Sequence, residues 1–415
     1  MSAQAVKDKP IKVLWLTSSY PRSKDDSASV FLRYLAEALA NQNISLHILS
    51  PDHCEVQVTE QAGGIVCSHF RYFWPRRLQL LAYGSGILPN LRATPWLLFQ
   101  VPFFMLSMFI TAAWIVLRDK PCLIHAHWIF PQGTVAVLLG KLFKIPVVVT
   151  AHGGDAFALK GFFVGALKRW TVKNCSAWTS NTNATADAVG PDLPKPRIIP
   201  MGIDYKKFAS GNAQTALKTD SQQKIILLFV GRLVEKKGVA DLIAAVVGLP
   251  KDLLDRVQLW IIGDGTERDH LKKLARDHQI EDKVVFHGRL PNAILPDYYA
   301  AADIFIAPSI VDANGDTEGQ GVIFLEAMAS NIPVISTNAG GIAEVIEHRK
   351  TGLLVNAKAP EEIKQAIELL VADKELRVSL KTAGQRVAES YDWEKMAVKF
   401  VSLYMVTREG LIISF

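Results

Sequence analysis

The stretch IILLFVGRLVEKKG, Ile225 to Gly238, decides the fold of the second half of the chain. Its first six residues are apolar without alternation, which is typical of a strand buried on both faces of a parallel sheet. The residues Gly231–Gly238 that follow predict a loop into a helix. The same alternation of apolar run and helix is repeated at Gln258–Ile262, Val284–Phe286, Asp303–Ala307, Val334–Ser336 and Gly352–Val355.

The first half shows the same pattern. We expect its strands at Lys12–Thr17, Ser45–Ser50, Leu123–Ala126, Val147–Thr150 and Ala177–Ser180, with helices between them. A chain of 415 residues is too long for one ordinary core. The sequence therefore predicts the α/β class with two doubly wound, Rossmann-like domains. Proline and polar residues between them predict a linker, which gives domains at 1–195 and 222–394 and a linker at 196–221.

Composition and charge restrict the class of protein. With 49% hydrophobic and 21% charged residues, the chain has the composition of a globular protein. Residues 1–200 carry 20 Lys and Arg against 11 Asp and Glu, so we expect the first half to meet something anionic. The cysteines Cys54, Cys67, Cys122 and Cys175 form no CxxC pair, and the residues before Ile11 lack the apolar run of a signal peptide. These features favour the reducing cytoplasm.

The segment Leu97–Leu117 contains no charged residue and is long enough to span a membrane. However, strands expected in one sheet lie on both sides of it in the sequence. We therefore expect a helix that is buried against the sheet and partly touches lipid.

Chemistry-bearing residues are expected directly after strands, because doubly wound sheets bind ligands outside the carboxyl ends of their strands. The strongest signal is GDTEGQGVIFLEAMA, Gly315–Ala329. After Gly319, Gln320 and Gly321, a helix start near Val322 offers N–H groups and a positive dipole end to a phosphate. Glu326 is placed to accept hydrogen bonds from a ribose, and Glu318 to hold a sugar beyond the phosphates. The alternative is two surface carboxylates at a helix start.

Other strand ends carry further candidates. Arg232 and Lys237 are expected to neutralise a diphosphate. In TAHGGDAF, His152 is placed to bind a sugar hydroxyl or to shield charge at an anomeric carbon. Asp155 orients His152, touches an acceptor or caps the next helix. Leu290, in HGRL, offers backbone groups to a base. Each has a structural alternative, namely solvated cations, a structural histidine or a plain turn.

The sequence HAHWIFPQG places His125 and His127 two residues apart on a strand. We expect their side chains to point to opposite faces of the sheet, so that they do not bind one metal ion together.

Taken together, these residues resemble the family-four retaining glycosyltransferases of the GT-B fold. The family's E-x7-E motif is similar to Glu318…Glu326, its GRL…KG loop to Gly231–Gly238, and its active-site histidine to His152. Its PMGID-type segment resembles Pro200–Asp204, and its closing segment resembles the YDWE sequence Tyr391–Glu394.

The resemblance implies two domains that face each other across a cleft, with the last helix, 395–415, crossing back onto the first. It implies that Arg232 and Lys237 hold the diphosphate of a UDP- or GDP-linked sugar, that Glu326 binds the ribose and that Glu318 binds the sugar. His152 is then near C6 or the anomeric carbon, and no metal or cofactor is needed. Ala28 and Ser29 stand where many members have glycines, so we name no catalytic base there.

The resemblance also implies a hexosyltransferase with a saccharide or polyprenyl-linked acceptor, as in cell-surface polysaccharide or glycolipid synthesis. The stretch Phe70–Leu91 mixes Arg71, Arg76 and Arg77 with aromatic residues, which favours peripheral contact with an anionic membrane on the inner face of the cell membrane. A buried aromatic cluster with solvated arginines is the alternative. Nucleic acid is not expected. Two rival functions stay open: a sugar-nucleotide epimerase of similar fold and a non-catalytic sugar-nucleotide-binding protein.

Overall fold

The computed structural model describes residues 10–22, 29–53, 61–84, 86–158, 161–216 and 224–410. It forms two compact units. Unit 1 comprises the residues up to Ser180, Ala186–Ile199 and the residues from Glu394 onward. Unit 2 comprises Pro200–Trp393 together with the short segment Asn181–Thr185. The expected positions Ala28, Cys54 and 217–221 lie outside the described residues.

Unit 1 is built on one sheet in the order β3-β4-β2-β1-β5-β6-β7-β8. All neighbouring pairs are parallel except β3 with β4. Apolar strand residues such as Leu14, Leu49 and Val149 are fully buried between two helical layers. The strands are β1 Ile11–Leu16, β2 Ile44–Pro51, β3 Gln61–Ala62, β4 Ile65–Phe70, β5 Leu123–His127, β6 Val147–Ala151, β7 Ala177–Ser180 and β8 Arg197–Ile198.

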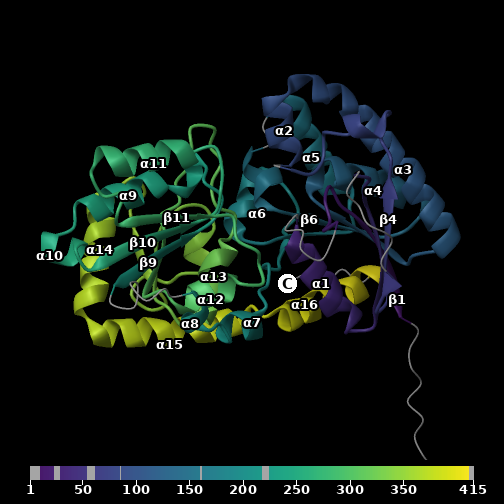
Figure 1. Cartoon of the computed structure of the whole chain (residues 1–415). Coiled ribbons are helices and arrows are strands. Elements are labelled where there is room, and N and C mark those ends of the chain that lie inside the picture. The colour runs from purple at the N-terminus through teal and green to yellow at the C-terminus, as the bar shows by residue number, and fades with distance from the viewer. Residues whose placement is uncertain are drawn as a thin grey trace, which may run out of the picture. The chain divides into compact units, whose positions relative to one another are not determined.

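Helices cover both faces of this sheet. In Figure 1, α3 and α4 lie on one side of it, and α1 and α16 lie on the other. The helices are α1 Val30–Ala40, α2 Ile87–Ala93, α3 Gln100–Asp119, α4 Thr134–Phe143, α5 Phe162–Asn174, α6 Asn183–Val189 and α16 Trp393–Arg408. Short helical turns are η1 Arg76–Leu78, η2 Pro95–Phe99, η3 Ile129–Gly133 and η4 Gly154–Ala158.

Unit 2 contains a parallel sheet in the order β11-β10-β9-β12-β13-β14. Helices α9 and α11 lie on one side of it, and α12 and α13 on the other (Figure 1). Its strands are β9 Ile225–Val230, β10 Val257–Ile262, β11 Val284–Gly288, β12 Ile304–Ala307, β13 Val334–Thr337 and β14 Leu353–Val355. Its helices and turns are α7 Tyr205–Ala209, α8 Ala213–Ala216, η6 Glu235–Lys237, α9 Val239–Val247, α10 Lys251–Leu254, α11 Arg268–Asp277, α12 Leu295–Ala300, α13 Val322–Ala329, η7 Ile342–Glu344, α14 Pro360–Ala372 and α15 Lys374–Ser390.

Each sheet has a point where the strand order reverses. In unit 2 the chain runs outward from β9 to β11 and then restarts at β12 on the other side of β9. The reversal therefore lies between β9 and β12, and in unit 1 it lies between β1 and β5. Loops diverge at such a point and leave a crevice at the carboxyl ends of the strands. The loops after β9 and β12 are therefore the first place to look for a ligand in unit 2.

The structure confirms the two doubly wound sheets. The expected strands Ala177–Ser180 and Ile225–Val230 agree with β7 and β9 to the residue. The segment expected as a linker holds structure in its described part, because β8 pairs with β7, and α7 and α8 belong to unit 2. Strands β3, β4 and β8 were not expected from the sequence.

Helix α16 is anchored in unit 1 by a buried hydroxyl. The fully buried Tyr404 accepts a hydrogen bond from Trp15 Nε1 over 3.2 Å. Its oxygen also lies 2.7 Å from His125 Nδ1, on β5. The hydroxyl thus joins α16 to the two strands at the reversal point of the first sheet.

We predict that Tyr404→Phe lowers the free energy of unfolding of unit 1 by about 1–3 kcal/mol, because two buried ring nitrogens lose a shared partner. Urea denaturation followed by tryptophan fluorescence measures the change. The neighbouring Met405→Ala, a half-exposed position, is the control and should be nearly neutral. Equal stability of Tyr404→Phe and wild type would contradict the anchoring role.

Candidate functional site

The two loops at the reversal point of unit 2 are joined by ion pairs. After β9, Lys237 Nζ donates to Glu318 Oε2 in the loop after β12. Lys236 Nζ lies 3.0 Å from Asp316 Oδ2 and donates to the carbonyl of Thr317 over 2.9 Å. Two predicted residues, Lys237 and Glu318, are thus in direct contact. Lys236 and Asp316 were not predicted as site residues from the sequence. The two consecutive lysines in EKKG, Lys236 and Lys237, could have indicated the first of them.

The Glu318 carboxyl is held in its charged form. Burial raises its pKa, but the neighbouring Lys237 ammonium, followed by Lys236 and Arg232, outweighs this effect, so the net pKa lies below the usual value. Arg232 is exposed, and no carboxylate of the described residues lies within ion-pair distance of it. This guanidinium is therefore a cation available to an incoming anion.

The loop before α13 supplies a helix start at the same place. Helix α13 begins at Val322, after Gly321 in the left-handed conformation with φ 77°. The first N–H groups of a helix have no partner within it and favour anions. The side chain of Gln320 is buried and binds the backbone of Met201: its Oε1 accepts from Met201 N over 2.7 Å, and its Nε2 donates to Met201 O over 2.8 Å. This side chain therefore holds the loop in place, and donor binding by Gln320 stays a prediction.

Two glycines fix the position of this loop. The backbone N–H of Gly341 donates to the carbonyl of Glu318 over 3.0 Å. A Cβ added to Gly341 would lie 2.0 Å from the Gly319 carbonyl oxygen, and one on Gly340 would lie 2.0 Å from that of Glu318. The hydroxyl of Thr182 also donates to the Gly319 carbonyl over 2.9 Å. The Gly-Gly pair therefore packs against the loop that carries Glu318.

Glu326 is not part of the Lys237–Glu318 pair. It lies in the second turn of α13, and its Oε2 accepts a hydrogen bond from the buried Tyr299 hydroxyl over 2.9 Å. Burial raises the pKa of Glu326 to about 7, against smaller opposing effects of the Tyr299 hydrogen bond and of Lys207. Near pH 7 the Glu326 carboxyl is therefore present in both its neutral and its charged form. Hydrogen-bond donors on a ligand, such as hydroxyl groups, would favour the charged form.

Leu290 lies in the loop after β11 and packs partly buried on the core of unit 2. The carbonyl of Gly288, just before it, accepts from the N–H of Gly263 after β10. A Cβ on Gly263 would lie 1.8 Å from the carbonyl oxygen of Gly231. The turns after β9, β10 and β11 therefore support one another at the edge of the sheet that carries the ion pairs.

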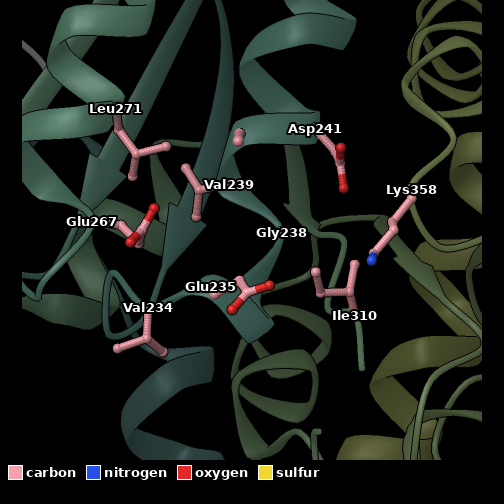
Figure 2. A pocket seen from close by; sticks show the side chains of 10 residues that line it. Val234, Glu235, Gly238, Val239, Asp241, Glu267, Leu271, Ile310 and Lys358 are labelled. Carbon is pink, nitrogen blue, oxygen red and sulfur yellow. The ribbon is translucent and has the colours of Figure 1, made fainter. Parts of the chain in front are cut away.

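A hollow of about 190 Å³ opens behind the loop after β9. Figure 2 shows the carboxylates of Glu235, Glu267 and Asp241 around it, with Lys358 as the cation on its wall. Its other walls are apolar and include Val239, Leu271 and Ile310. Three acidic side chains repel a diphosphate, so this hollow does not suit that group.

His152 and Asp155 belong to unit 1. His152 follows β6, is 7% exposed, and burial lowers its pKa to about 3, so the ring is neutral. The Oδ1 atom of Asp155 accepts from the backbone N–H of His152 over 2.8 Å, and its Oδ2 accepts from that of Ile129 over 2.7 Å. With its own exposure at 2%, Asp155 joins the ends of β5 and β6 and holds the backbone at His152.

The expectation that His125 and His127 point to opposite faces is wrong. Residues two apart on a strand share a face, and the two ring centroids lie 4.3 Å apart. His127 Nδ1 lies 3.3 Å from His152 Nε2, so the three histidines form one buried group on this face. Within the described residues, no group of three or more His, Cys, Asp or Glu side chains has the arrangement of a metal site.

The raised pKa of Glu326 predicts a pH-dependent stability. Because the folded-state pKa exceeds the unfolded one, folding favours the proton, and stability falls as pH rises from about 4.5 to about 7. The free energy of unfolding of wild type, relative to Glu326→Gln, should fall by up to about 3 kcal/mol over this range. Urea denaturation at several pH values measures it. The exposed Glu375→Gln serves as control, and parallel curves for wild type and Glu326→Gln would contradict the assignment.

The close packing at Gly341 predicts that Gly341→Ala shifts the Glu318 loop. We expect a loss of about 1–3 kcal/mol in the stability of unit 2, as for other overpacked sites, together with weaker nucleoside diphosphate binding. Thermal unfolding with and without UDP or GDP measures both. Gly248→Ala is the matched control, because its new Cβ would meet only the flexible Lys364 side chain closer than 3.4 Å. A Gly341→Ala protein that behaves like this control would contradict the packing argument.

Comparison with known proteins agrees with this architecture. The family model described as Glycosyltransferase Family 4 matches residues 28–207, and the model described as Glycosyl transferases group 1 matches residues 214–387. The chain is 18% identical to the crystallised HepE of Anabaena in complex with UDP. That comparison has a TM-score of 0.73 and covers 95% of this chain and 99% of that one, so the two share the GT-B fold.

Two relatives are closer in sequence. A GDP-mannose-dependent phosphatidylinositol monomannoside mannosyltransferase of Mycobacterium tuberculosis is 32% identical over 52% of this chain, and the match spans 56% of that protein, little more than half its length. An uncharacterized glycosyltransferase of Methanocaldococcus jannaschii is 33% identical over 70% of this chain and 77% of its own. With both halves matched by family models and a relative of this similarity, the chain belongs to glycosyltransferase family 4.

Proposed function

We propose that this chain transfers a hexose from a nucleoside diphosphate sugar to a saccharide or lipid-linked saccharide acceptor, with retention of the anomeric configuration. The observation that carries the proposal is the meeting of Arg232, Lys237, Glu318 and the start of α13 at the reversal point of the second sheet. An exposed guanidinium, a second cation and the start of a helix suit a diphosphate.

The same groups supply the chemistry of sugar transfer. As the glycosidic bond breaks, negative charge grows on the diphosphate, and Arg232, Lys237 and the helix start stabilise it where it forms. Glu318, charged and held by Lys237, accepts hydrogen bonds from hydroxyls of the transferred sugar. For retention, we propose that the acceptor attacks from the face that the diphosphate leaves, and that the diphosphate takes the acceptor's proton.

The nucleotide is proposed to be UDP or GDP. The solved HepE structure contains UDP, and the mycobacterial relative is described as GDP-mannose-dependent. Glu326, with its pKa near 7, is proposed to bind the ribose hydroxyls, and the backbone near Leu290 the base. His152, buried and neutral, is proposed to act on the sugar as a hydrogen-bonding group. We propose that the reaction needs no metal ion, because Arg232 and Lys237 supply the charge that a cation would bring.

The acceptor is proposed to be presented at the cytoplasmic face of a membrane, in the synthesis of a surface polysaccharide or glycolipid. The excess of basic residues in positions 1–200 supports contact with an anionic surface. The phosphatidylinositol mannoside that the mycobacterial relative is named for is itself a lipid-linked acceptor.

The proposal is tested by incubating the protein with UDP- and GDP-hexoses and an acceptor, and by measuring nucleoside diphosphate release and the product's anomeric configuration by NMR. Loss of Glu318 in Glu318→Ala should lower kcat at least about 100-fold, as for other removed transition-state contacts. Arg232→Ala should weaken donor binding about tenfold, since a charge-assisted hydrogen bond is lost. The exposed Arg386→Ala is the matched control.

The rival functions give different outcomes in the same assay. An epimerase converts the sugar nucleotide into its epimer without an acceptor, and a binding protein leaves it unchanged while still shifting in thermal stability. Wild-type rates in both Glu318→Ala and Arg232→Ala would refute the proposed site. An inverted product would refute retention alone.

A further inference from the structure

Helix α3 of unit 1 is apolar on two opposite faces. Its inner stripe, which includes Phe104, Met108 and Ile115, is fully buried in the core. Its outer stripe consists of apolar side chains that are 43–65% exposed. These are Phe103, Leu106, Ile110, Trp114 and Leu117, at successive spacings of three or four residues that keep them on one side of the helix. A helix that meets only water on its outer side carries polar residues there.

The apolar surface continues beyond α3. Just before the helix, η2 exposes Trp96, Leu98 and Phe99. Helix α3 packs beside α4, and α4 beside α5. These neighbours expose Leu138 and Leu142 on α4 and Phe162 and Phe163 at the start of α5, the last two more than 80%. We refer to this combined surface of η2, α3, α4 and the start of α5 as the α3–α5 face. Scattered single apolar residues are normal on soluble proteins, but a set of this size on packed neighbouring helices marks an interaction surface.

Charges around the α3–α5 face are almost all positive. Residues 86–175 contain nine Lys and Arg and only two acids, Asp119 and Asp155. Asp155 is buried, and Asp119 is already paired with Arg118 over 2.6 Å and with His47 over 2.7 Å. Exposed cations include Arg92, Lys120, Lys144 and Arg169. Arg118 stacks over the Trp114 ring at 4.2 Å, a tryptophan–arginine arrangement suited to a lipid headgroup region.

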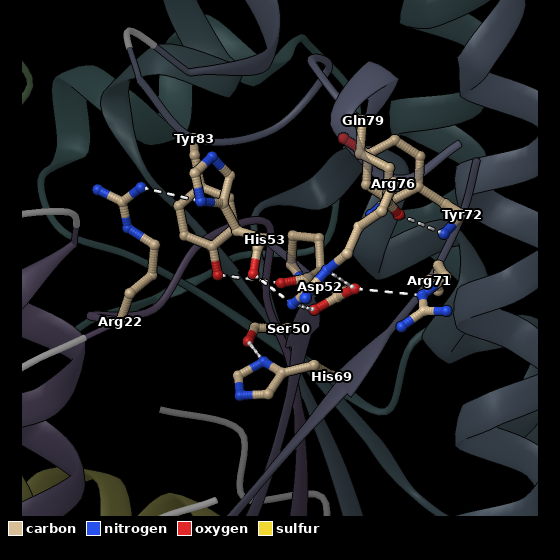
Figure 3. Close-up of polar contacts among 11 residues, drawn as sticks. Arg22, Ser50, Asp52, His53, His69, Arg71, Tyr72, Arg76, Gln79 and Tyr83 are labelled. Atoms are coloured by element: carbon tan, nitrogen blue, oxygen red, sulfur yellow. Dashed lines mark hydrogen bonds and ion pairs between the residues drawn. The ribbon is translucent and has the colours of Figure 1, made fainter. Parts of the chain in front are cut away.

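The basic and aromatic stretch 70–91 is partly engaged in contacts within unit 1. Figure 3 shows Arg71 and Arg76 turned toward the carboxylate of Asp52, which accepts from Arg76 Nη2 over 2.6 Å and from Arg71 Nε over 3.3 Å. Tyr72 and Tyr83 are each only 4% exposed. Part of this stretch is thus a buried aromatic cluster with two paired arginines, whereas Trp74 and Arg77 are exposed, and its contact with a membrane stays a prediction.

Among the described residues, one helical segment is long and apolar enough to cross a membrane. It is Pro95–Asp119, which contains η2 and α3. Crossing is excluded by its neighbours in the sequence. Strand β4 precedes it and β5 follows it, and both are joined through β2 and β1 in one sheet. A spanning helix would place these strands on opposite sides of a bilayer. The helix can therefore enter a membrane only by lying in its surface.

We propose that the α3–α5 face docks on an anionic lipid bilayer, with α3 lying in the plane of the interface. The outer stripe inserts among the acyl chains, and the surrounding Lys and Arg bind anionic headgroups. Helices α4 and α5 begin at the carboxyl edge of the sheet, where His152 also lies, so docking brings this edge to the lipid surface. The biological role of this docking rests on the proposed function, because a lipid-linked acceptor would reach the enzyme at the membrane surface.

Vesicle co-sedimentation of the full chain tests the docking. Wild type should bind vesicles that contain phosphatidylglycerol and bind pure phosphatidylcholine vesicles much more weakly. Ile110→Glu should reduce binding at least about tenfold, because it places a charge in the apolar stripe. Val378→Glu is the matched control, since this valine is 56% exposed on α15 of unit 2, and it should bind as wild type does. Salt at about 0.5 M should weaken binding of wild type, because it screens the headgroup contacts.

Several results would overturn the docking. Equal vesicle binding by Ile110→Glu and wild type, with equal thermal unfolding of the two, would refute the α3–α5 face. Absence of wild-type binding to phosphatidylglycerol vesicles would refute the membrane as partner. Light scattering that shows a lipid-free dimer, dissociated by Ile110→Glu, would identify a second copy of the chain as the occupant instead. Because vesicle binding needs no sugar transfer, its failure and that of the proposed function are separate outcomes.

Discussion

The ion pair between Lys237 and Glu318 is the interaction on which the candidate site depends. It joins the loop after β9 to the loop after β12, and these are the two loops that a reversal of strand order forces apart. A buried carboxylate is costly unless a cation compensates it, and here the lysine keeps it charged. Removing either partner would leave the other charge without its partner in a largely buried place. The ion pair therefore stabilises the relative position of the two loops.

The surroundings of this pair consist largely of backbone packed on backbone. Gly340 and Gly341 contact the carbonyls of Glu318 and Gly319, and Gly263 contacts that of Gly231. Such contacts leave no room for side chains, and they fix the positions of the loops through their backbones. Arg232 takes no part in these glycine contacts and stays exposed.

The fold was largely predictable, because most strands are unbroken apolar runs. Strand β4 escaped prediction because its sequence, IVCSHF, contains polar residues. In the structure Ser68 pairs with His47, and His69 pairs with Ser50, so the polar side chains are satisfied across the strand pair β2–β4. The site was predictable where a residue type and a strand end coincide, as for Lys237 and Glu318. Gln320 shows the limit: only the structure reveals that its side chain binds the backbone of Met201, 119 residues away.

The short segment Asn181–Thr185 means that the chain cannot be divided into its two units by a single cut. It belongs to unit 2 although the residues on both sides of it belong to unit 1. Thr182 binds the Gly319 carbonyl, and the backbone N–H groups of Asn183 and Ala184 bind the carboxylate of Glu344 over 2.8 and 2.9 Å. A recombinant fragment cut from the chain at a single boundary near residue 200 would lack these five residues. Unit 2 is thus not a contiguous module, and gene fusions that exchange halves between family members have to carry this segment along.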